Sequence, residues 1–144
     1  MNRSGRLAAA AALALVLPFP AACRRRPDSQ AAAYVRSLAR TEAPLEHAWR
    51  RFDAAAGRGD WEAARSRARV ASSAAARARA VLEREPVPPE LSVARREELV
   101  FLNHAVLGFQ DFDGRGGGRD ELEILHSTLR RGRAHQALGR ESLH

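Results

Sequence analysis

The chain of 144 residues contains no lysine and only one cysteine, one tyrosine and one methionine. A single cysteine cannot form an intramolecular disulfide, and it cannot build a zinc site that needs several thiolates. All 24 basic side chains are arginine, and 30 residues are alanine. Alanine, arginine, glycine and proline have GC-rich codons, so part of this bias reflects genome composition rather than function.

The signature motifs of several enzyme and cofactor classes are missing as well. The sequence has no Gly-x-Ser-x-Gly, no P-loop and no Cys-x-x-Cys-His. The glycine-rich stretch 114–118 lacks the Lys-Ser/Thr of a P-loop, so it is interpreted as a flexible loop between helices. Asp111, Asp113 and Asp120 do not follow the spacing of a calcium loop. We therefore expect no catalytic residue, no cofactor and no metal site.

Residues that favour β-strands are also scarce. Val, Ile, Thr, Tyr and Phe are sparse, and no stretch alternates apolar and polar residues long enough to predict a strand. Ala, Arg, Leu and Glu dominate, and all four favour helix. The composition predicts an all-α fold within a single domain.

The start of the sequence has the features of a targeting segment. Residues 1–6 carry two arginines and no acid, and residues 7–17 are wholly apolar. This arrangement is typical of a secretory signal. Eleven apolar residues are too few for a transmembrane helix, which needs about 20. Pro18 and Pro20 would also break any helical extension.

The only cysteine follows this apolar segment directly. Ala21 and Ala22 precede Cys23, and the segment resembles the lipobox of bacterial lipoproteins. The resemblance implies cleavage before Cys23, lipidation of its thiol and attachment to membrane lipid in the bacterial cell envelope. Pro20 departs from the leucine usual at that position of the lipobox and from the small residue of an ordinary signal-peptidase site. Plain secretion is therefore the alternative, and the resemblance covers residues 1–23 only.

Positive charge is concentrated next to this segment. The whole chain has a net charge of +7, but from Pro27 onward it has 19 arginines against 17 acidic residues. Arg24, Arg25 and Arg26 adjoin the expected anchor, where they favour anionic lipid headgroups or simply begin a soluble tether. The overall basicity is thus a poor argument for nucleic acid, and none is expected as a partner.

Glycine and proline divide the remaining chain into four segments, with breaks at 57–59, 85–89 and 113–118. The segments at 61–82 and 91–112 are each 22 residues long, or about 33 Å as helices. The segment at 120–139 is nearly as long. Helices of equal length with short connections fold back on one another, so we expect an up-down antiparallel bundle of about four helices. Helical hairpins or a coiled-coil assembly are the alternative.

Each segment has one apolar stripe at helical spacing. In the third segment the stripe is the most apolar and is expected to form the centre of the core, whereas in the second it consists mostly of alanine. Because alanine buries little apolar surface, the core of a monomer is expected to be only marginally stabilising, and a homodimer is the partner state that would bury more. The stripes comprise Tyr34, Leu38, Leu45, Trp49 and Phe52; Trp61, Ala64, Ala68, Ala71, Ala75, Ala78 and Leu82; Leu91, Leu99, Leu102, Val106, Phe109 and Phe112; and Leu122, Leu125 and Leu129, which Gly132 and Gln136 would continue.

Two local features need interpretation. Pro44 lies inside the first segment and is expected to kink the helix or to start a new one near Thr41. Residues 130–140 are polar, so this last third of the fourth segment is expected to fray into a free tail. The predicted organisation is a signal peptide at 1–22, a lipid-anchored basic tether at 23–30, a helical bundle at 31–140 and a tail at 141–144.

Histidines are the remaining candidates for chemistry. Glu123 and His126 form one Glu-x-x-His motif, but a di-iron bundle needs two such motifs and further glutamates. His47 and His104 lie on predicted helices and could face the core. We expect a non-enzymatic, lipid-anchored envelope module for scaffolding or binding of a protein partner, with Cys23 as its lipidation site. The alternative is a secreted bundle that binds a small ligand or metal, with His104, His126 or several glutamates in one cavity.

Overall fold

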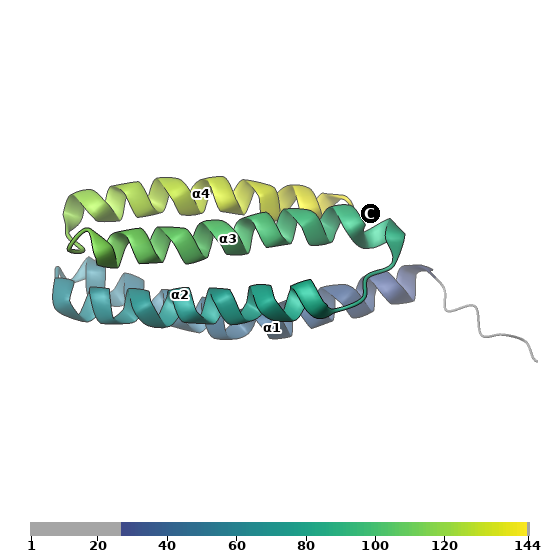
Figure 1. The fold of residues 1–144 in the computed structure, drawn as a ribbon, viewed down its shortest axis with the longest axis horizontal. Coiled ribbons are helices and arrows are strands. Elements are labelled where there is room, and N and C mark those ends of the chain that lie inside the picture. Colours follow the sequence, from purple (N-terminus) through teal and green to yellow (C-terminus); the bar gives the residue numbers. More distant parts are fainter. Residues whose placement is uncertain (1–26, 144) are drawn as a thin grey trace, which may run out of the picture.

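The computed structural model describes residues 27–143, and this part of the chain is all-α. Its helices are α1 (Pro27–Gly57), α2 (Trp61–Arg84), α3 (Ser92–Gly114) and α4 (Arg119–Glu141), with a 3-10 turn η1 (Pro89–Leu91) before α3. Figure 1 shows the four helices packed lengthwise, with the α2–α3 connection at the end where α1 begins. The predicted all-α helical bundle is confirmed. The predicted signal peptide, Cys23 and residues 24–26 lie outside the described residues.

Short polar caps fix where the helices begin. The carboxylate of Asp60 accepts a hydrogen bond from the Ala63 backbone N–H at 3.1 Å, as expected of an N-cap residue. Before α4, the Gly118 backbone N–H donates to the Glu121 carboxylate at 2.9 Å. Among the helices described, none has the length and apolar character needed to cross a membrane.

Pro44 lies within a continuous α1, so the prediction of a new helix near Thr41 is wrong. Proline removes one backbone hydrogen bond from a helix interior, at a cost of about 3 kcal/mol. The residues on either side offset this cost because they pack into the core. Leu38 and Leu45 are buried, while Pro44 itself faces solvent.

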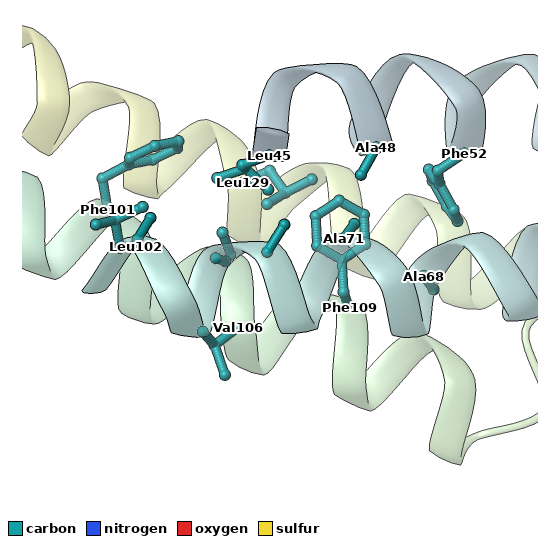
Figure 2. Packing of buried hydrophobic residues seen from close by; sticks show 14 of the residues in the cluster. Leu45, Ala48, Phe52, Ala68, Ala71, Phe101, Leu102, Val106, Phe109 and Leu129 are labelled. Carbon is teal, nitrogen blue, oxygen red and sulfur yellow. The ribbon is translucent and has the colours of Figure 1, made fainter. Parts of the chain in front are cut away.

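The core is built from phenylalanines that fill the space left by alanines. Phe52 of α1 meets Phe109 and Phe112 of α3 edge to face, with ring centroids 5.3 and 5.0 Å apart. Figure 2 shows Ala68 and Ala71 of α2 beside Phe52 and Phe109 of this aromatic group. The small side chains of α2 let the neighbouring helices come close, and the rings supply the apolar area that alanine lacks.

The second half of α4 is an ordered helix, so the predicted fraying of residues 130–140 is wrong. Gly132, Gln136 and Gly139 are buried. A β-carbon at Gly139 would lie 3.1 Å from the Ala94 carbonyl oxygen of α3, tighter than most contacts. The glycines thus allow the two backbones to approach closely. The sequence predicted fraying because residues 130–140 are polar, whereas in the structure Gln136 and the two glycines of this region pack against α3.

Candidate functional site

The histidines and the Glu-x-x-His motif do not converge on one site. Glu123, His126 and His47 are all exposed. His104 is half-buried, and its Nδ1 lies 2.8 Å from the Val100 carbonyl oxygen one turn earlier. Within residues 27–143, no group of three or more His, Cys, Asp or Glu side chains is arranged to hold a metal ion.

Polar side chains instead gather between α1 and α4, in a strip that we name the α1–α4 seam (Glu42, Glu46, Arg133, Gln136 and Arg140). The backbones pack closely between α1 and α2, between α2 and α3, and between α3 and α4. Long side chains bridge the remaining side of the bundle. Arg133 forms an ion pair with Glu46, and its guanidinium lies 4.8 Å from the ring centre of Trp49. The seam thus closes the bundle through charge and cation–π contacts.

The deepest part of the seam is a buried polar cluster. Glu42, Glu98 and Gln136 are each about 95 % buried or more. The Gln136 side-chain amide donates to Glu42 at 3.2 Å and to Glu98 at 3.0 Å, so one residue of α4 joins α1 to α3. Arg140 also donates to Glu42, at 3.2 Å. Buried polar groups that are hydrogen-bonded in this way fix one arrangement of the helices.

Burial governs the ionisation of this cluster. Loss of water around Glu98, together with the neighbouring Glu42 carboxyl, raises the pKa of Glu98 to about 9. Glu98 is therefore protonated at neutral pH, and the two carboxyl groups do not repel each other as a pair of anions. Burial likewise raises the pKa of Tyr34 to about 12. The carboxyl group of Glu98 thus holds a proton, and the hydrogen bonds of the cluster join α1, α3 and α4.

An open groove of about 540 Å³ lies elsewhere, between α2 and α3. Three arginines line it, Arg79 from α2 and Arg95 and Arg96 from α3. Glu83 is the acidic residue of its lining, and Val87, Leu99 and Val100 supply apolar surface. We name this feature the arginine groove. It can receive a negatively charged group joined to an apolar one.

A smaller cleft of about 250 Å³ lies between α1 and α4 beside the seam. Trp49 and Asp53 of α1 line it together with His126 and two arginines of α4, Arg130 and Arg133. His126 thus shares a cleft with a carboxylate, but both side chains belong to exposed residues. The arrangement offers a surface for polar contacts.

No family model, curated protein or solved structure matches this chain. Function is therefore inferred from its own residues and their geometry.

The sequence did contain a signal for the buried cluster, although the predicted sites missed it. Glu42 falls between Leu38 and Leu45 on the apolar stripe of α1, at spacings of four and three residues. Glu98 falls in the same way between Ala94 and Phe101 on α3. A charged residue at a core position predicts a buried, hydrogen-bonded group. The partners of that group could not be predicted, because they come from other helices.

Proposed function

We propose that this protein is a lipid-anchored, non-enzymatic module of the bacterial cell envelope that serves as a scaffold or binds a protein partner. The observation that carries the proposal is the position of Cys23, the sole cysteine, directly after an apolar segment and two alanines. The proposed mature chain begins at Cys23 and is held on the membrane by acyl chains. A partner is either a second copy of the chain or another protein.

The length of the tether supports this arrangement. Only three residues, Arg24, Arg25 and Arg26, separate Cys23 from the start of α1 at Pro27. The four steps from Cys23 to Pro27 span at most about 14 Å when fully extended. An anchor at Cys23 therefore keeps the beginning of α1 within that distance of the lipidated residue, and one end of a rigid bundle is held near the membrane.

The way in which the buried polar groups are used supports a non-enzymatic role. Glu42, Glu98 and Gln136 bond to one another across three helices. They fix the shape of the bundle, which is what a scaffold requires. The alternative function, binding of a small ligand, draws its support from the arginine groove, whose charge favours an anion over a metal ion.

Replacement of the cysteine tests the anchor. We expect mass spectrometry of the wild-type membrane fraction to show a protein that begins at a diacylated Cys23. Cys23→Ser should abolish metabolic labelling with fatty acid, and this diacylated form should be missing from its membrane fraction. The matched control changes Arg24, Arg25 and Arg26 to Gln, because a diacylated anchor is strong without adjacent basic residues. This control should keep its label and stay in the membrane fraction in high salt. Unchanged labelling of Cys23→Ser would contradict the proposal.

A further inference from the structure

The outward face of α3 carries apolar side chains that the bundle does not cover. Val93, Val100 and Leu107 recur every seven residues and so lie along one side of the helix. Val93 is 42 % exposed and Leu107 is 53 % exposed, whereas Val100 between them is half-buried. Arg96 lies between the first two on the same side. This row borders the arginine groove, because Val100 and Arg96 also belong to the lining of the groove.

The arginines of the groove retain donors for a further partner. Arg95 donates to the Glu83 carbonyl oxygen at 2.6 Å, and Arg79 donates to the Asn103 side chain at 3.1 Å. The Nε atoms of both arginines are buried, and the Nε of Arg79 lies 3.5 Å from the Glu83 carboxylate. Because a guanidinium has five N–H donors, these contacts leave terminal N–H groups of both side chains available.

The acidic groups nearby leave an excess of positive charge in the groove. Glu83 lies 3.5 Å from Arg79, so it offsets one of the three arginines that line the groove. Arg96 contacts Glu97 at 3.3 Å, but its side chain is 70 % exposed and Glu97 also bonds to His135. Guanidinium groups beside exposed apolar side chains are complementary to an anionic headgroup above acyl chains.

We propose that the arginine groove and the outer row of α3 form one docking surface for acidic phospholipid headgroups of the bilayer. The proposal rests on the lipid anchor proposed above. A free phosphate compound would use the arginines but not Val93 and Leu107, whereas a membrane surface uses both. The bundle then lies with its α2–α3 side on the bilayer instead of standing on one end.

The position of the groove relative to the tether allows this contact. Ser37 of α1 donates to Glu85, the residue that follows α2, at 3.3 Å. The α2–α3 connection therefore lies beside the first third of α1, the end held by the anchor, as Figure 1 shows. From Pro27 to Ser37 the helix rises about 15 Å, comparable to the reach of the tether.

The test uses the processed, lipidated protein reconstituted into two kinds of vesicle, phosphatidylcholine alone and an equal mixture of phosphatidylcholine and phosphatidylglycerol. Hydrogen exchange of backbone amides in residues 92–107 is the measurement. We expect exchange to be about fivefold slower in the mixed vesicles, the protection given by a ligand at about four times its Kd. Arg96→Gln and Leu107→Gln should each reduce this protection. Glu83→Gln should increase it, since Arg79 is then free of its carboxylate.

Matched variants on α4 serve as controls. Leu138 is as exposed as Leu107, at 54 %, and Arg131 is exposed like Arg96. Leu138→Gln and Arg131→Gln should leave the protection unchanged. Equal exchange in both vesicle types would overturn the docking surface, and so would equal protection by glycerol phosphate added to phosphatidylcholine vesicles. Failure of the protein to co-sediment with phosphatidylcholine vesicles would instead contradict the anchor, which separates the two proposals.

Discussion

Glu98 occupies a core position of α3 and is 2 % exposed, yet it carries a carboxyl group. Its bonds to Gln136 and its proximity to Glu42 explain why it is tolerated there. A buried acid of this kind stabilises the fold only while it is protonated, because its anion has lost the surrounding water. At the scale of single residues, it is the group whose ionisation the fold changes most clearly.

The raised pKa of Glu98 predicts how stability depends on pH. Its folded pKa of about 9 exceeds the ordinary value of 4.5, so the folded state binds more protons between these two values. Stability contributed by this group is therefore lost as pH rises through that window, by roughly 1 kcal/mol per pH unit. Glu98→Gln keeps a neutral group able to hydrogen-bond with both Gln136 and Glu42. We expect this variant to unfold with a flatter dependence on pH and to be more stable than the wild type at pH 8.

Chemical denaturation at a series of pH values measures this difference. Glu123→Gln is the matched control, since Glu123 is exposed on α4 and its replacement should leave the pH dependence as it is. If Glu98→Gln and the wild type lose stability in parallel as pH rises, Glu98 is not the buried acid described here.

A second comparison between single residues tests which side of each helix faces the core. Leu102 is 1 % exposed within the aromatic core. Leu102→Ala should lower the free energy of unfolding by about 2–5 kcal/mol, through lost burial and the cavity left behind. Arg69 lies on the outer side of α2, where it pairs with Asp113 at 2.9 Å. Arg69→Ala should cost no more than about 1 kcal/mol, because surface ion pairs contribute little. Equal losses in denaturant titrations would show that the assignment of faces is mistaken.

At the scale of elements, α4 shows how far the sequence could be interpreted. The stripes of apolar residues and the glycine and proline breaks located all four helices, because these signals are local. The polar half of α4 remains helical because it packs against α3. The local sequence pattern of α4 does not reveal this contact. Gly132 lies against Phe101 and His104, and Gly139 lies against Ala94. Contacts between helices therefore determine the structure of this half of α4, and they also determine the hydrogen-bond partners of the buried glutamates.

Gly139 offers a test of α4 in which the sign of the effect is informative. In a frayed tail, Gly139→Ala would favour helix formation by about 1 kcal/mol. In the packed helix, the added methyl group meets the Ala94 carbonyl oxygen and the Glu97 side chain, and overpacking costs typically about 1–3 kcal/mol. We expect a net loss of stability in thermal unfolding. Gly57→Ala is the control, because a β-carbon at Gly57 meets no atom within 4 Å. If Gly139→Ala were more stable than the wild type, the interpretation of residues 130–140 as a frayed tail would be correct after all.

At the scale of the whole molecule, the bundle has three sides closed by compact packing and one closed by long polar side chains. Small residues allow close approach between α3 and α4, at Gly132 and Gly139. Between α1 and α4, the ion pair of Arg133 with Glu46 and the bonds of Gln136 to Glu42 span the gap. The two hairpins, α1–α2 and α3–α4, are thus each compact and are joined to one another by the α2–α3 packing and by the seam.

This division has a consequence for the order of assembly. Each hairpin forms from contacts between neighbouring stretches of chain, whereas the bond between Arg140 and Glu42 joins residues 98 positions apart. Closing so long a loop costs more entropy, so the seam forms after the hairpins. Contacts made late in folding change the rate of unfolding and leave the rate of folding nearly unaltered. The hairpins therefore set how fast the bundle forms, and the charged seam sets how long it persists once formed.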